Sequence, residues 1–177
     1  MFYHKPELYY AKIYIIEVLY YMNEVDLSDK SWGIPFTCRV AALIISNNNF
    51  LVAKNDNHPM YYTIGGAIKV HESSEDAIIR EVFEELGIHL EVDRLVFIQE
   101  RFFEVKSKKH HEIVFFYLMK NAPNMCVTDF LKTDNPYETM RWLPLNGLEN
   151  YEIIPQFLKS KCLNNITSLE HIISFDY

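Results

Sequence analysis

The stretch GAIKVHESSEDAIIREVFEELGI at residues 66–88 decides the fold, because it describes one long helix with two different faces. Ser73 or Ser74 can cap the start of that helix, and the acidic residues that follow favour its positive end. No proline or glycine interrupts the run, and Gly87 stands where a left-handed C-terminal cap is wanted. The stretch therefore predicts a helix over residues 74–86.

The predicted helix carries an apolar face and a carboxylate face. At about 100° per residue, Glu81, Glu84 and Glu85 fall within an arc of roughly 100°. The opposite, core-facing side is expected to comprise Ile79, Val82, Phe83 and Leu86. Three carboxylates at this density repel one another, and the residues four positions later offer no lysine partner. In isolation E-x-x-E-E more often marks an ordinary charged helix face, so a metal site depends on the residues around it.

The complete pattern, G-x5-E-x7-R-E-U-x-E-E-x-G-U with U aliphatic, resembles the signature of the Nudix (MutT-type) hydrolases. Its fixed positions are filled by Gly66, Glu72, Arg80, Glu81, Glu84, Glu85 and Gly87. The resemblance covers roughly residues 26–160. It implies an α+β fold, an α/β/α sandwich with a mixed β-sheet and the motif helix packed on one side.

The resemblance also implies roles for single residues of the motif. The backbone carbonyl of Gly65 is expected as a metal ligand, and Ile64 stands where many family members have proline, which removes no ligand. Arg80 is expected to orient a catalytic glutamate, with Glu72 paired to it and Gly66 supporting the loop. On spacing alone, the two glycines fit a simple turn and Glu72 fits a surface loop.

Residues outside the motif complete the candidate site. Glu112 begins an apolar strand and is a candidate metal ligand or general base, although a charge facing water fits equally well. Arg39 is a candidate contact for a substrate phosphate, because guanidinium matches phosphate geometry; a strand-edge salt bridge fits as well. Tyr62 and Phe103 can stack on a base or another ring, although most aromatic residues belong to a core or its rim.

Length and composition restrict the class of protein. A chain of 177 residues with 49% hydrophobic residues fits one folded domain rather than a disordered chain. The net charge of −7 argues against binding to duplex nucleic acid. Three widely spaced cysteines form neither a disulfide framework nor a zinc pattern, so a cytoplasmic location is expected. A homodimer is compatible with the sequence.

The chain is expected to divide into an N-terminal extension at residues 1–25 and a domain at residues 26–177. The apolar run at residues 9–22 is too short for a membrane span, and it either packs on the domain or docks to a partner. Met22 raises the hypothesis that the residues before it precede the physiological start. Strands are expected at 36–46, 50–54, 61–64, 90–105, 111–120 and 138–143, a charged turn at 106–109, a helix at 154–161 and an extended segment near Ile172.

The resemblance to the Nudix hydrolases implies hydrolysis of a diphosphate (pyrophosphate) linkage in a nucleoside diphosphate joined to another group. Hard oxygen ligands select Mg²⁺ or Mn²⁺, which polarises phosphoryl oxygens and lowers the pKa of bound water. The expected catalytic residues are Glu84 or Glu85, with Glu81 and Arg80 beside them. The expected partner is a small-molecule nucleotide, selected by loops at 55–59 and 121–137. The alternative is a nucleotide-sensing module without turnover.

Overall fold

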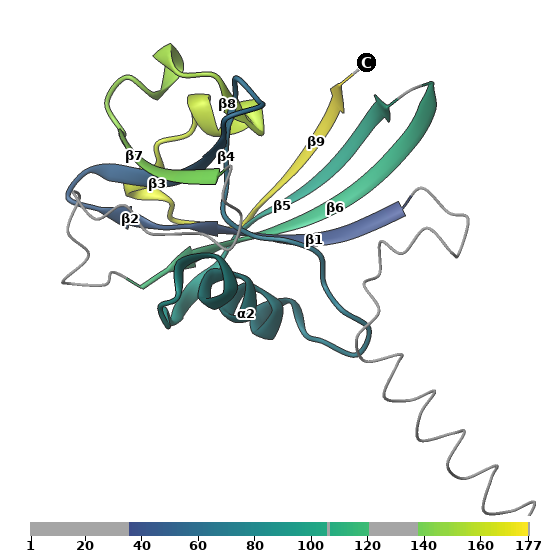
Figure 1. Ribbon diagram of the computed structural model, residues 1–177, viewed down its shortest axis with the longest axis horizontal. Helices are drawn as coiled ribbons and strands as arrows, with labels where there is room; N and C mark the ends of the chain where they lie inside the picture. The colour runs from purple at the N-terminus through teal and green to yellow at the C-terminus, as the bar shows by residue number, and fades with distance from the viewer. Residues whose placement is uncertain (1–35, 106, 121–137, 177) are drawn as a thin grey trace, which may run out of the picture.

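The computed structural model describes residues 36–105, 107–120 and 138–176 (Figure 1). The expected N-terminal extension and the loop at 121–137 lie outside these ranges. The strands are β1 (Phe36–Leu43), β2 (Ile45–Ser46), β3 (Asn49–Asn55), β4 (Tyr61–Tyr62), β5 (Val92–Val105), β6 (Lys108–Met119), β7 (Glu138–Pro144), β8 (Ile153–Ile154) and β9 (Glu170–Asp176). The helices are α2 (Ser74–Leu86) and three 3-10 helices, η2 (Leu148–Asn150), η3 (Gln156–Ser160) and η4 (Leu163–Asn165).

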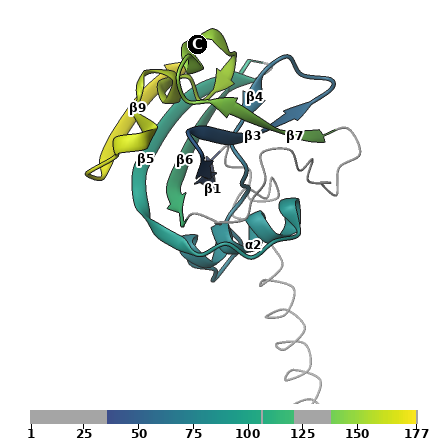
Figure 2. The same ribbon diagram turned by 90° about the vertical axis from the view of Figure 1, so that its left-hand side faces the viewer.

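Two sheets form the centre of the described part of the molecule. One has the order β1-β6-β5-β9 and is mixed, since β1 runs parallel to β6 while β5 and β6 form a long antiparallel hairpin. The other has the order β2-β3-β4-β8, with β7 paired to β3. In both views α2 lies on one side of the strands, and β7 lies on the other side (Figures 1 and 2).

Strand β1 separates two apolar cores because its side chains alternate between opposite faces. Val40 and Ala42 pack in the cluster that contains the buried residues of α2. Ala41 and Leu43 pack in a second cluster with residues of η2, η3 and η4. The expected α+β class and the expected packing of the motif helix on one side of a mixed sheet are therefore confirmed.

Helix α2 has the expected bounds and both expected caps. The side chain of Ser73 accepts a hydrogen bond from the N–H of Asp76 at 3.0 Å. Gly87 has φ of 67°, and its N–H donates to the carbonyl of Phe83 at 2.8 Å. The prediction for the core-facing side was partly wrong. The buried residues are Ala77, Ile78, Val82 and Leu86. Phe83 is 44% exposed and stacks on His89.

Three other expectations can be compared with the structure. The break between the strands expected at 36–46 and 50–54 is confirmed as a turn, since Asn47 and Asn48 have φ of 47° and 62° between β2 and β3. The charged turn at 106–109 was predicted too long, because β6 already begins at Lys108. The helix expected at 154–161 is shorter and of the 3-10 type, because β8 ends just before Pro155 and η3 follows it. Proline lacks an N–H and disfavours helical backbone in the residue before it. Within the described ranges, no helix is long and apolar enough to cross a membrane.

Candidate active site

The loop before α2 is held tightly against β1. Val40 and Ala42 donate backbone hydrogen bonds to the carbonyls of Gly66 and Ile64 at 2.9 and 2.8 Å. Gly65 has φ of 143°, and a Cβ there would lie 2.2 Å from the carbonyl oxygen of Val40. The backbone thus requires glycine at position 65, where the loop crosses the strand.

Gly66 serves a different purpose from its neighbour. A Cβ at this position would lie 2.4 Å from the carboxylate of Glu81. Because real Cβ atoms do not approach other atoms so closely, any side chain here would displace that carboxylate. The absence of a side chain at Gly66 therefore lets Glu81 lie directly against the loop backbone.

Arg80 connects the loop and the helix through all of its hydrogen-bond donors. Its Nε and one terminal nitrogen bind the two oxygens of Glu72 at 2.7 and 2.9 Å, and that nitrogen also donates to the Ala67 carbonyl at 3.0 Å. The other terminal nitrogen binds Glu81 at 2.7 Å and Glu84 at 2.9 Å. A guanidinium has five N–H groups, so the described contacts use all of them.

This network changes the electrostatic argument drawn from the sequence. The motif glutamates lack a lysine partner, but Arg80 supplies counter-charge to both Glu81 and Glu84. Burial acts to raise the pKa of Glu72, but hydrogen bonds from Arg80 and the Lys69 N–H outweigh it and lower that pKa. Burial dominates at Glu81 and raises its pKa despite Arg80. Glu84 is 47% exposed at the edge of the cluster.

Glu85 is the motif carboxylate with the least compensation. Its Oε1 accepts a hydrogen bond from the N–H of Gly65 at 3.1 Å. Burial, together with the negative charges of Glu138 and Glu81, raises the pKa of Glu85 to about 8. A carboxylate in this state gains more from a nearby cation than one already paired with arginine.

Glu85 lies in a cleft of about 420 Å³. Strands β1, β5 and β6 contribute one side of the cleft, on the face of their sheet opposite to α2, and residues of β4, β7 and β8 contribute the other. Its polar and charged lining comprises Arg39, Tyr62, Thr63, Glu85, Gln99, Arg101, Glu112 and Glu138. The cleft thus has a carboxylate end at the motif and a mixed-charge end on the long strands.

The predicted residues outside the motif fall in different places. Glu112 lies between two arginines, with its carboxylate 3.8 Å from Arg39 Nε and 3.8 Å from Arg101, and it accepts a hydrogen bond from Thr37 at 3.1 Å. Arg39 and Glu112 form an ion pair with each other. Both side chains also line the cleft, where a substrate could contact them. Tyr62 also lines the cleft.

Phe103 lies farther along β5 and is not part of the cleft lining. Its ring packs against His110 at 5.0 Å, and the guanidinium of Arg101 lies 4.5 Å from its centre. A stacking contact with a substrate ring in the cleft would therefore require a ligand that extends beyond the cleft.

The sequence interpretation missed three cleft residues, Gln99, Arg101 and Glu138. Gln99 and Arg101 are separated by two positions on β5, so they share a face with Phe103, and this period of two was the available signal. Glu138 stands at the first position of β7, accepts a hydrogen bond from the Tyr62 hydroxyl and adds negative charge beside Glu85. No local pattern marks Glu138, because its partner Tyr62 is 76 residues away.

The donor set at the motif end fits a hard divalent cation. Glu85 and Glu81 provide carboxylate oxygens, and the backbone bonds between the loop and β1 use the carbonyls of Ile64 and Gly66 but not that of Gly65. Within the described ranges, no three acidic, histidine or cysteine side chains converge into a closed metal cage. Mg²⁺ does not need one, because it is usually held by one or two carboxylates together with waters and substrate phosphates.

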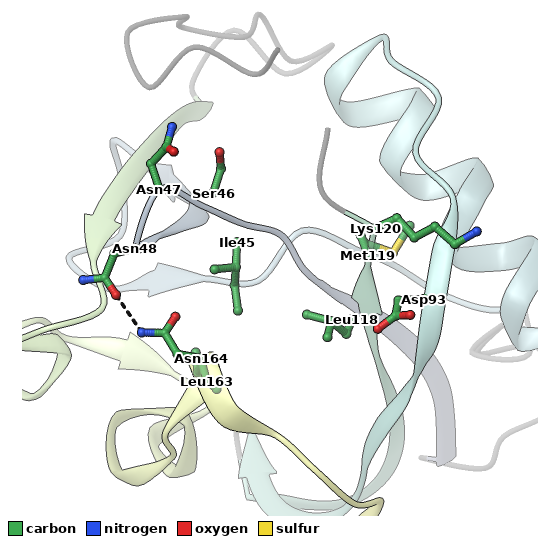
Figure 3. A pocket seen from close by; sticks show the side chains of 10 residues that line it. All are labelled: Ile45, Ser46, Asn47, Asn48, Asp93, Leu118, Met119, Lys120, Leu163 and Asn164. Atoms are coloured by element: carbon green, nitrogen blue, oxygen red, sulfur yellow. Dashed lines mark hydrogen bonds between the residues drawn. The ribbon is translucent and has the colours of Figure 1, made fainter. Parts of the chain in front are cut away.

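A second cavity, of about 490 Å³, lies away from the motif between the β2–β3 turn, the end of β6 and η4 (Figure 3). Asn48 and Asn164 meet there through a hydrogen bond of 2.6 Å. Its lining contains one carboxylate, Asp93, beside Lys120. The smaller cleft, which contains Glu85, therefore has the chemistry of a candidate active site and this cavity does not.

Comparisons with known proteins agree with the motif and the fold. The model of the NUDIX domain family matches residues 36–160, which is more than half of the chain. The chain therefore belongs to the NUDIX family, hydrolases that act on phosphorus-containing anhydrides. A comparison with curated protein sequences gives no match.

Solved structures share the fold at low sequence identity. A mutator MutT protein from Bacillus halodurans has a TM-score of 0.61 at 14% identity, covering 78% of this chain and 90% of that one. A MutT protein from Methanosarcina mazei Go1 has a TM-score of 0.51 at 26% identity, covering 72% and 90%. An ADP-ribose pyrophosphatase from Streptococcus suis has a TM-score of 0.51 at 16% identity, covering 79% and 98%.

Proposed function

We propose that this protein hydrolyses a diphosphate linkage in a nucleoside diphosphate joined to another group, and that it depends on Mg²⁺ or Mn²⁺. The observation that carries the proposal is the position of Glu85, a largely buried carboxylate of raised pKa that lies in a cleft also lined by Arg39. Water adds to one phosphorus atom, the bridging P–O bond breaks, and two phosphate-bearing products leave.

The cation would be held by Glu81, Glu84, Glu85 and the carbonyl of Gly65, with Glu112 as a proposed further carboxylate. When bound, it would polarise the phosphoryl oxygens and lower the pKa of a water molecule. Other residues of the protein hold the carboxylates in position. Arg80 holds Glu81 and Glu84 in place, and Glu72 in turn fixes Arg80.

Glu85 is the best-placed group to accept a proton from water. Its Oε1 is engaged by the Gly65 N–H, which leaves Oε2 for the proton. A general base works best when its pKa lies near the working pH, and the raised pKa of Glu85 meets that condition. The negative charges of Glu138 and Glu81 add to burial in raising the pKa of Glu85.

Arg39 is the proposed contact for a substrate phosphate. Its side chain is 42% exposed and lines the cleft, and its Nε lies 3.8 Å from Glu112, beyond hydrogen-bond distance. Among the residues that the structure describes, the guanidinium therefore keeps donors free for a phosphate while Glu112 limits its movement. In this arrangement the diphosphate lies between Arg39 and Glu85.

The proposal is tested by phosphate release from a nucleotide panel with Mg²⁺ or Mn²⁺ and an added phosphatase. The panel contains ATP, a dinucleoside polyphosphate, ADP-ribose and UDP-glucose. We expect turnover of at least one compound, its loss in Glu85→Gln and its retention in Glu75→Gln, a change of an exposed residue in the first turn of α2. Thermal stabilisation by a nucleotide without any turnover would instead support a sensor.

Two further expectations stay predictions. The widely spaced cysteines favour a reducing compartment such as the cytoplasm, and fractionation of cells would test it. A homodimer is tested by light scattering of the purified protein. Among structural neighbours are a UDP-X diphosphatase and an ADP-ribose pyrophosphatase, and their presence motivates the sugar-linked compounds in the panel.

A further inference from the structure

The cleft contains a buried amide, Gln99 on β5, whose hydrogen bonds are only partly satisfied. The side chain is 2% exposed, and its Nε2 donates to Ser174 Oγ on β9 at 3.0 Å. Its Oε1 is buried and has no hydrogen-bond partner among the residues that the structure describes. Leaving such an oxygen unpaired is costly, because it has lost its hydrogen bonds to water without gaining another. A ligand in the cleft that carries a hydrogen-bond donor would recover that cost.

Strand β9, whose Ser174 accepts the hydrogen bond from Gln99, lies outside the match to the NUDIX domain. That match ends at residue 160, whereas β9 comprises Glu170–Asp176. Strand β9 pairs in parallel with β5 from Phe97 to Phe103. It therefore adds an edge strand beside β5, the strand that contributes Gln99 and Arg101 to one side of the cleft.

Two side chains of β9 reach residues of the cleft lining. Ser174 accepts the hydrogen bond from Gln99, and Asp176 accepts one from Arg101 Nε at 2.6 Å. Both Gln99 and Arg101 line the cleft. Strand β9 thus positions an amide and a guanidinium that the motif itself does not reach.

The polar groups beside Gln99 indicate which chemistry this end of the cleft accepts. The strand register places Glu112 opposite Arg101, so acceptors and donors alternate on this face of the sheet. A sugar hydroxyl can donate to Gln99 and accept from Arg101. An additional phosphate can only accept, and the charge of Glu112 opposes it. A group rich in hydroxyls therefore fits better than a longer phosphate chain.

We propose that Gln99, positioned by Ser174, is a specificity-determining residue that accepts a hydrogen bond from a hydroxyl of a sugar on the far side of the substrate diphosphate. The inference rests on the proposed function, since it assigns the group joined to the nucleoside diphosphate. Catalysis itself does not require Gln99, because the amide lies on β5 and not among the motif carboxylates.

The test compares substrates that differ only in the sugar. ADP-ribose and UDP-glucose are each compared with the β-methyl ester of the same nucleoside diphosphate, which lacks the distal sugar. In Gln99→Met, which keeps the volume and removes the acceptor, we expect KM for a sugar-bearing substrate to rise about tenfold, as for one lost hydrogen bond. We expect KM for the methyl ester and kcat for both to stay within about twofold. Equal changes in KM for both substrates overturn the proposal.

Neighbouring residues on β9 provide a matched control. Ser174→Ala should raise KM for the sugar-bearing substrate about threefold, and Ser174→Thr, which retains the hydroxyl, should restore most of it. Ile173 precedes Ser174 on the same strand and is 55% exposed on the other face. Ile173→Ala should leave KM unchanged. If it shifts KM as much as Ser174→Ala does, the effect comes from the strand as a whole and the proposal fails.

Failure of the proposed hydrolysis can be distinguished from failure of the inference about Gln99. If the wild-type protein hydrolyses no compound in the panel, the same pairs are compared by the rise in melting temperature that each ligand produces with Mg²⁺. A rise with ADP-ribose or UDP-glucose that is lost in Gln99→Met, with no such difference for the methyl ester, supports the inference without turnover. An equal rise in both proteins, or none in either, overturns it.

Discussion

The two ends of the cleft are built in different ways. At the motif end Glu85 lines the cleft. Next to it, outside the cleft lining, Arg80 joins Glu72, Glu81 and Glu84 through hydrogen bonds of 2.7–2.9 Å, and all of these residues lie between positions 72 and 84. At the strand end, Arg39 and Arg101 approach Glu112 only to 3.8 Å. The contacts there join residues about 75 positions apart, as between Gln99 and Ser174.

The difference separates reaction chemistry from recognition. A network with every donor used has one arrangement, and such preorganisation is what stabilisation of a transition state requires. Looser pairs and a half-satisfied amide leave hydrogen-bonding capacity for a ligand. Changes at the motif end should therefore act on kcat or on the fold, and changes at the strand end should act on KM.

The largest effect is expected from the two adjacent glutamates of the motif. Glu85→Gln should lower kcat about 10³-fold, within the range for loss of a general base. Glu84→Gln should lower it about tenfold, because Glu84 is half exposed and already bound to Arg80. Initial rates with saturating Mg²⁺ measure both, and circular dichroism checks the fold. A larger loss in Glu84→Gln would reverse the assignment of roles.

Arginine-to-lysine changes at the two ends should lower the free energy of unfolding by different amounts. Arg80→Lys removes the double contact with Glu72 and leaves two carboxylates without a close partner, so it should cost about 3 kcal/mol. Arg101→Lys keeps a charge beside the half-exposed Asp176 and should cost about 0.5 kcal/mol or less. Urea unfolding compares the two variants. Similar losses of unfolding free energy would contradict the contrast between a tight and a loose network.

The raised pKa of Glu85 predicts how stability without metal depends on pH. The folded protein keeps the proton up to about pH 8, whereas the unfolded chain loses it near 4.5, the ordinary value. Between these values the folded state binds more protons, so the free energy of unfolding falls as the pH rises through this window. The loss should be on the order of 2 kcal/mol, with Glu81 adding in the same direction.

Urea unfolding in EDTA at pH 5, 6.5 and 8 measures this slope. In Glu85→Gln the slope should be much flatter, because the titrating group is gone. Mg²⁺ added at pH 8 should raise the unfolding free energy of the wild-type protein more than that of the variant. An unchanged slope in Glu85→Gln would show that other groups control the pH dependence.

The motif end could be predicted from sequence because its determinants are local. The caps of α2, its length and the carboxylates on one face follow from neighbouring residues, and the structure contains them at the expected positions. The prediction for Phe83 was wrong because helical spacing alone does not show where the neighbouring strands end. In the structure its ring packs on His89, outside the core.

The strand end could be predicted only in part. Arg39, Tyr62 and Glu112 were candidates and do line the cleft, but Gln99, Arg101 and Glu138 were missed. The period of two on β5 was the available signal for Gln99 and Arg101, but their contacts with Ser174 and Asp176 depend on the register between β5 and β9, which no local pattern encodes. A shift of one residue would turn both side chains to the opposite face.

The smallest effect is expected at Gly87, the glycine that ends the motif helix. Its φ of 67° is unfavourable for alanine, but a Cβ there would meet nothing within 4 Å. Gly87→Ala should therefore cost about 1 kcal/mol of stability and leave kcat unchanged. Gly66→Ala is its counterpart, because the added Cβ would displace the carboxylate of Glu81 and should lower kcat about tenfold or more. Unfolding curves and initial rates on both variants test the pair, and a loss of kcat in Gly87→Ala would mean that the end of α2 also affects the geometry of the cleft.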